Sequence, residues 1–130
     1  GAGLGAWRQE AAGSPEAIEV RLAPAEAFTL VASKRHSSPA QERLLTGLSE
    51  RFGDLQLANI GSSLKFCLLA TGEGDIYPRF SPTMEWDTAA GHAIARAAGM
   101  EVYQAGKEEP LQYNKEDLLN PWFIVEPRRN

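Results

Sequence analysis

Short apolar runs alternate along most of the chain with segments whose apolar side chains recur at helical spacing. Residues 28–32, 55–60, 75–80, 102–104 and 123–125 form runs that predict β-strands. The segments that begin at Ser38, Ser62 and Trp86 and end near Gly53, Leu69 and Gly99 predict helices. Strands separated by helices of this length are joined by right-handed crossovers, which place helices on both faces of a sheet. The pattern therefore predicts an α/β fold with a layered, largely parallel sheet.

Residues 1–27 differ in character from residues 28–130, and we treat them as a separate unit. They are rich in Gly, Ala and Pro, and their glycine spacing does not match a dinucleotide-binding fingerprint. The alternation of apolar and charged residues over 17–22 predicts an edge strand. Residues 28–130 then form the α/β domain.

Composition and charge narrow the range of functions. The chain has 130 residues, of which 43% are apolar and 23% charged, as in ordinary globular domains. Seventeen acidic residues against 13 Lys and Arg give a net charge of −4, so no broad basic surface for a nucleic-acid polymer is expected. The single cysteine, Cys67, is interpreted as a small buried hydrophobe in a reducing compartment. No apolar stretch is long enough to predict a transmembrane segment.

Polar residues gather where ligands of parallel sheets bind, at the carboxyl ends of strands and the helix starts that follow. The candidates in chain order are His36, Ser62, Ser63, Lys65, Arg79 and Asp87. The serines follow a strand and open a helix, so backbone N–H groups and hydroxyls are presented to an anion. The competing interpretation makes Ser62 a helix cap and Lys65 a solvated lysine. Arg79 lies on an apolar strand and needs a partner, either a carboxylate or a phosphate.

Asp87 lies at the start of a helix built largely of alanine. The helix dipole favours an ionised carboxylate there, and such a group can ligate a hard cation such as magnesium. The alternative is that Asp87 only caps the helix. We interpret Glu85 as a solvent or cap residue, His92 as structural, and Trp86 as the core anchor of an apolar face. That face continues through Ala90, Ala93, Ile94 and Ala97.

Four motifs together carry a family resemblance. They are Gly61-Ser62-Ser63-Leu64-Lys65 followed by Tyr77-Pro78-Arg79-Phe80, then Trp86-Asp87-Thr88-Ala89-Ala90-Gly91, then Tyr113-Asn114-Lys115 through Leu119-Asn120-Pro121. In this order they resemble the carboxy-terminal half of the 3'(2'),5'-bisphosphate nucleotidases. These enzymes belong to the lithium-sensitive, magnesium-dependent phosphatase superfamily that includes inositol monophosphatase. No separate role follows for residues 113–120, apart from a turn at Asn120-Pro121 that would end a short helix.

The resemblance implies a fold, a cofactor and a set of site residues. The fold is the carboxy-terminal domain of the inositol monophosphatase-like architecture, with residues 1–27 as a remnant hairpin of the amino-terminal domain. The cofactor is Mg²⁺. Asp87 is expected to be the catalytic metal ligand and also to contact substrate, and the expected substrate-binding residues are His36, Ser62, Ser63, Lys65 and Arg79.

Two family motifs of the amino-terminal half are missing from this chain. These are a Glu-Glu pair and an Asp-Pro-hydrophobic-Asp-Gly motif, and no Asp-Pro or Asp-Gly dipeptide occurs in the sequence. The chain is therefore expected to be about half of an enzyme, inactive alone, with the amino-terminal half as its partner. Its apolar strand residues Phe28, Val31, Leu57 and Ile60 are expected to flank that partner.

The parent enzyme is expected to remove the 3'-phosphate from adenosine 3',5'-bisphosphate, a step of nucleotide recycling in sulfate assimilation. The expected location is the cytoplasm, with peripheral attachment at the inner membrane face as a second possibility. Two alternatives stay open. One is a non-catalytic binding or assembly module, and the other is inositol monophosphatase activity.

Overall fold

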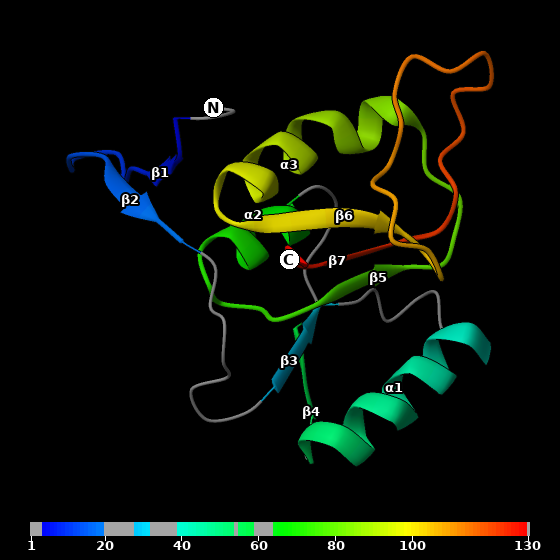
Figure 1. Ribbon diagram of the computed structural model, residues 1–130. Helices are drawn as coiled ribbons and strands as arrows, with labels where there is room; N and C mark the ends of the chain where they lie inside the picture. The colour runs from blue at the N-terminus through cyan, green and yellow to red at the C-terminus, as the bar shows by residue number, and fades with distance from the viewer. Residues whose placement is uncertain (1–3, 20–27, 32–38, 54, 59–63, 130) are drawn as a thin grey trace.

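The computed structural model describes residues 4–19, 28–31, 39–53, 55–58 and 64–129 (Figure 1). The strands are β1 (Ala6–Arg8), β2 (Glu16–Ile18), β3 (Phe28–Val31), β4 (Leu55–Ala58), β5 (Tyr77–Arg79), β6 (Met100–Gln104) and β7 (Phe123–Pro127). The helices are α1 (Pro39–Phe52), α2 (Leu64–Ala70) and α3 (Glu85–Ala97). Each predicted strand and helix of the α/β domain is confirmed, with boundaries shifted by at most two residues.

The strands of the α/β domain follow one another in the spatial order β4-β3-β5-β7-β6. β3 pairs with β4 in parallel, and a parallel bridge between Leu30 and Ile76 joins β3 to the residues that lead into β5. β7 is antiparallel to both β5 and β6. Four of these five described strands therefore run in the same direction, which confirms the α/β fold with a largely parallel sheet. β7 is the exception, because residues 105–122 return the chain from β6 without a crossover helix.

The helices cover both faces of the sheet, as predicted (Figure 1). On one face, Leu45 and Leu48 of α1 pack with Leu30 and Ile76. On the other face, α2 and α3 contribute to the main core, whose members are Val31, Phe66, Leu69, Tyr77, Ala95, Met100, Val102, Leu111, Phe123 and Val125.

The small residues of α3 allow it to lie close against α2. A methyl group placed on Gly91 would stand 2.5 Å from Cδ2 of Phe66, far inside van der Waals contact. The ring of Phe66 meets Tyr77 edge-on at 5.5 Å and stacks near Phe123 at 6.0 Å between centroids. Gly91 in the Trp-Asp-Thr-Ala-Ala-Gly motif thus serves packing between two helices.

The amino-terminal hairpin stands beside α2 and α3 as a separate two-stranded sheet (Figure 1). β1 and β2 are antiparallel, and Ala6 packs with Ala70 and Ala98. The edge strand expected over 17–22 is observed at Glu16–Ile18, and residues 20–22 lie outside the described part of the chain. Within the described residues, no helix is long and apolar enough to cross a membrane.

The expected apolar flank is not observed at Val31 and Phe28, and the short helix expected near Asn120 is wrong. Val31 is fully buried, and the Phe28 ring stacks on Phe52 at 4.2 Å, so neither presents a bare apolar flank; the Leu57 side chain and Ile60 are not among the described groups. The exposed large apolar side chains lie elsewhere, and include Leu4, Trp7, Leu64, Trp86, Ile94 and Trp122. The short helix expected before Asn120 is also not formed, because residues 113–120 adopt an extended, turning path.

Candidate active site

The candidate site lies at the carboxyl edge of the parallel strands. β5 ends at Arg79, α2 carries Lys65 in its first turn, and α3 carries Asp87 in its first turn. Three further predicted site residues, His36, Ser62 and Ser63, fall outside the described residues, so their roles stay predictions.

Lys65 and Arg79 form a pair of neighbouring cations. Lys65 is only 4% exposed, and its Nζ lies 5.4 Å from the centroid of the Tyr77 ring. Burial lowers the pKa of Lys65, and the positive charge of Arg79 lowers it further. Neither cation makes an ion pair with a carboxylate within the part of the chain that the structure describes. The pair therefore holds positive charge in a sheltered place where an anion would restore balance.

The Arg79 guanidinium also has an unused donor. Its Nε is buried and has no hydrogen-bond partner among the described residues. Its charge and a side-chain hydrogen bond act on Tyr77, whose pKa is nevertheless raised because burial outweighs both. A buried donor without a partner calls for an explanation, and a bound ligand is one. The predicted anion-binding role of Lys65 and Arg79 is consistent with this geometry.

Asp87 occupies the third position of α3 and is exposed. Its Oδ2 accepts a hydrogen bond from the backbone N–H of Met84 at 2.9 Å, so the carboxylate does help to cap the helix. One oxygen is used in this way, and the second can still face a cation. Among the described residues, no group of three or more His, Cys, Asp or Glu side chains could hold a metal ion. Asp87 thus fits as one magnesium ligand, and the others must come from water, substrate or further protein groups.

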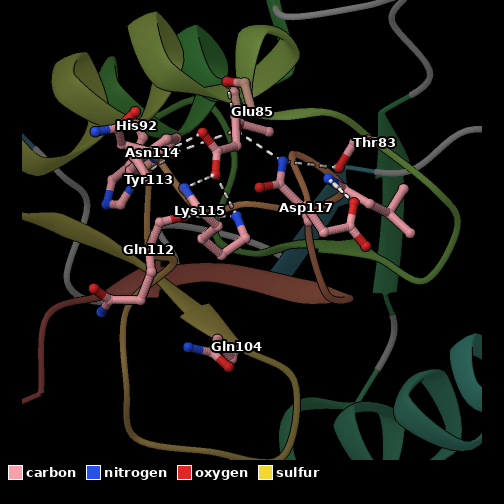
Figure 2. A network of polar contacts seen from close by, with 12 residues as sticks. Thr83, Glu85, His92, Gln104, Gln112, Tyr113, Asn114, Lys115 and Asp117 are labelled. Atoms are coloured by element: carbon pink, nitrogen blue, oxygen red, sulfur yellow. Dashed lines mark hydrogen bonds and ion pairs between the residues drawn. The ribbon is translucent and has the colours of Figure 1, made fainter.

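Glu85 is not the solvent residue that the sequence suggested. It is 9% exposed, and its carboxylate accepts hydrogen bonds from Asn114 N at 2.8 Å, from Lys115 N at 3.2 Å and from Lys115 Nζ at 2.5 Å (Figure 2). The hydrogen bond from the Lys115 side chain is the main reason that the pKa of Glu85 is lowered. The partners lie about 30 positions away, so no local pattern could have revealed them.

The predictions for Trp86 and His92 have opposite outcomes. Trp86 is 67% exposed, so the prediction that it anchors the core is wrong, and Ile94 on the same apolar face is 40% exposed. His92 is buried and structural, as predicted. Its Nδ1 lies 2.7 Å from the Tyr113 hydroxyl and its Nε2 lies 2.6 Å from Oε1 of Glu101.

Comparisons with known proteins relate the chain to one family of phosphatases. The model of the inositol monophosphatase family matches residues 2–129. The chain is 44% identical over 121 residues to the 3'(2'),5'-bisphosphate nucleotidase CysQ of Escherichia coli K12, which covers 92% of this chain and 46% of that protein. It thus spans about half the length of the curated relative.

Solved structures show the same relationship. The crystal structure of CysQ from Bacteroides thetaiotaomicron, a bacterial member of the inositol monophosphatase family, superposes with a TM-score of 0.84 at 53% identity. It covers 98% of this chain and 52% of that chain. Inositol monophosphate-bound SaIMPase-II, at 18% identity, covers 98% of this chain and 46% of its own, and its TM-score of 0.68 shows the shared fold alone.

Proposed function

The chain belongs to the inositol monophosphatase family, and from that premise we propose that it supplies the nucleotide-binding half of a 3'(2'),5'-bisphosphate nucleotidase. The proposed reaction is magnesium-dependent removal of the 3'-phosphate from adenosine 3',5'-bisphosphate. The names of its CysQ relatives support this choice over inositol phosphate. We propose the cytoplasm as the place of this reaction, a reducing compartment in which the free thiol of Cys67 is stable.

The observation that carries the proposal is the sheltered pair Lys65 and Arg79. Two neighbouring cations, one with a lowered pKa and one with a buried unpartnered Nε, favour a ligand of high negative charge. A nucleotide with two phosphate groups has that charge. A planar guanidinium can bind a phosphate through two parallel hydrogen bonds, and the lysine adds a point charge. Ser62, Ser63 and His36 are proposed to complete this site.

Asp87 is proposed to contribute one metal ligand. Bound magnesium would polarise phosphoryl oxygens and lower the pKa of a water molecule. Asp87 would hold the ion through the oxygen that does not cap α3. With a single carboxylate, this chain alone is proposed to bind magnesium weakly and to be inactive.

The partner is proposed to be the amino-terminal half of the family fold, seated against the outer face of α3. Ala93, Ile94 and Ala97 of that face line a cavity of about 430 Å³, which Trp7 and Ile18 of the hairpin close from the other side. The lining is apolar, and exposed apolar surface of this kind marks an interaction site.

Kinetics on the full-length protein test the assignment. Lys65→Ala and Arg79→Ala should each raise KM for adenosine 3',5'-bisphosphate by roughly 10- to 100-fold, because each removes a charge-assisted hydrogen bond to phosphate. Asp87→Asn should chiefly lower kcat. Inositol 1-phosphate serves as the comparison substrate.

Three results would refute the proposal. They are an unchanged KM in Lys65→Ala, a preference for inositol 1-phosphate, and nucleotide binding with no turnover by the complete protein. The second outcome points to inositol phosphatase activity, and the third points to a binding module.

A further inference from the structure

We propose that residues 113–120 form a positioning element for Asp87, and that Lys115 is its principal positioning residue. The inference rests on the proposed function, because the place of Asp87 matters only if it holds a metal ion. Figure 2 shows this segment beside the first turns of α3, with Asn114 and Lys115 directed at Glu85.

The first anchor is the carboxylate of Glu85. It begins α3, two residues before Asp87, and it receives the Lys115 ammonium and two successive backbone N–H groups. Lys115 Nζ also donates to the carbonyl of Gln112 at 2.9 Å, so the ammonium is fixed from both sides. A charge-assisted contact with several donors holds a carboxylate more firmly than a single neutral hydrogen bond would.

The turn that presents those donors has an unusual backbone. Asn114 has a φ of 64°, the one positive φ among described residues other than glycine. In a turn with such a residue, successive N–H groups can point to the same side and form a concave anion site. Here the anion is the Glu85 side chain. The segment is therefore shaped to grip this carboxylate.

The second anchor holds the residues on either side of Asp87. Asn120 Nδ2 donates to Oγ1 of Thr88 at 3.0 Å and to Oγ1 of Thr83 at 3.2 Å. The backbone N–H of Asn120 also donates to the carbonyl of Thr83 at 2.9 Å, and that of Glu85 donates to Leu118 at 2.9 Å. The first turn of α3 is thus tied to this segment before and after Asp87.

A third anchor lies one turn further along. Tyr113, at the start of the segment, contacts His92 Nδ1 and donates to Thr88 Oγ1 at 3.3 Å. His92 contacts Glu101 of β6 on its other nitrogen. Through His92 of α3, the positioning element is therefore connected to the sheet.

Asp87 itself has little else to hold it. The one hydrogen bond of its carboxylate within the described residues comes from Met84 N, which belongs to the same turn. The carboxylate is exposed, so surrounding side chains do not fix its direction. Its location is therefore set by the turn on which it stands, and that turn is set by the three anchors.

The polar character of the contact argues for positioning rather than stability alone. Replacing buried ion pairs with apolar residues is often neutral or stabilising, so such a pair is weak evidence for stability. Hydrogen-bonded networks instead select one register, because only one arrangement satisfies all members. A metal ligand needs a fixed register, since magnesium demands near-octahedral geometry.

Lys115→Met in the full-length protein tests the inference. Magnesium affinity is measured by calorimetric titration, and the magnesium concentration for half-maximal activity is measured in parallel. The magnesium dissociation constant and the half-maximal magnesium concentration should both rise by about 10- to 100-fold, the effect usual for groups that orient a metal ligand. KM for the nucleotide at saturating magnesium should change less than about twofold, because Lys65 and Arg79 are untouched. Lys115→Arg, which keeps the charge, should restore most of the affinity.

Matched variants separate positioning from general damage. Arg129→Met removes the ion pair with Glu126 near the end of β7 and should leave magnesium affinity unchanged. Asn120→Ala removes the second anchor and should also weaken magnesium binding. It provides the test if Lys115→Met fails to fold. A lower melting temperature with unchanged magnesium affinity in both Lys115→Met and Asn120→Ala would overturn the inference.

The outcome is distinguishable from failure of the proposed function. If the full-length protein binds magnesium but does not turn over the nucleotide, the calorimetric comparison still decides the role of Lys115. If the unaltered protein binds no magnesium at all, both proposals are wrong.

Discussion

In α3, three polar side chains are buried and two large apolar side chains are exposed, which is the reverse of what hydropathy suggests. Glu85, Thr88 and His92 lie on the inner face and are at most 9% exposed, whereas Trp86 and Ile94 on the outer face are 67% and 40% exposed. The polar groups of the inner face are engaged, since residues 113–120 and Glu101 offer them partners, and Gly91 and Ala95 of that face pack in the core. The outer face is apolar and has only the hairpin beside part of it.

This contrast shows that burial in α3 follows the available partners. A polar group can be buried when it is hydrogen-bonded, and an apolar side chain stays exposed when nothing covers it. The inner face therefore holds the candidate metal ligand in place, while the outer face is the surface on which we propose that the other half of the family fold rests.

Among changes to α3, we expect the largest loss of stability from one at its contact with α2. Gly91→Ala forces the Phe66 ring to move, and overpacking of this kind costs roughly 1–3 kcal/mol. The better helix propensity of Ala offsets about 1 kcal/mol of it. We expect the melting temperature to fall by roughly 5 °C, measured by thermal denaturation.

The matched control is Gly47→Ala in α1, where an added methyl group meets nothing within 4 Å. That variant should gain about 1 kcal/mol from helix propensity alone. Equal stability of the two variants would show that Gly91 is not required for the close approach of α2 and α3.

A change on the outer face should affect association and leave folding almost intact. Trp86→Gln should shift stability by less than about 0.5 kcal/mol, because the side chain is largely exposed. It should weaken self-association or binding of the amino-terminal half by about tenfold, the effect of losing one large apolar contact. Analytical ultracentrifugation and native mass spectrometry measure this.

Trp122→Gln is the control, because Trp122 is also exposed at 48% but lies outside α3. Equal loss of association in both variants would argue against a specific surface. A stable monomer that binds no partner would contradict the assembly proposal itself.

The sequence predicted the elements because their signals are local. The apolar runs, the Ser38-Pro39 start signal and Gly53 each act within one element, and the structure forms α1 and the strands where these signals lie. The carboxyl-edge rule also predicted that Lys65 and Arg79 belong to one site, and the charge of Arg79 does lower the pKa of Lys65.

Three features could not be predicted, for physical reasons. The direction of β7 depends on the path of residues 105–122 from the end of β6, and no periodic pattern of apolar residues indicates that path. The partnership of Glu85 with Lys115 joins residues far apart in the chain. The periodicity of α3 showed that one face is apolar, but which face the rest of the fold covers is decided by tertiary contacts.

The smallest expected effect concerns the charge of Glu85 on the inner face. The pKa of Glu85 is lowered from its ordinary 4.5 in the folded protein, chiefly by the hydrogen bond from Lys115. A depressed folded pKa contributes stability that is present above the unfolded value and is lost as the pH falls through the folded value. Stability should therefore decline below pH 4.5, and part of that decline should be absent in Glu85→Gln. Urea unfolding midpoints measured between about pH 3 and pH 7 give the difference.

Glu116→Gln, an exposed change in the same segment, should follow the unaltered protein at every pH. If the Glu85→Gln midpoints run parallel to those of the unaltered protein, the carboxylate is not held in its charged form by residues 113–120, and the contrast between the two faces of α3 loses its electrostatic part.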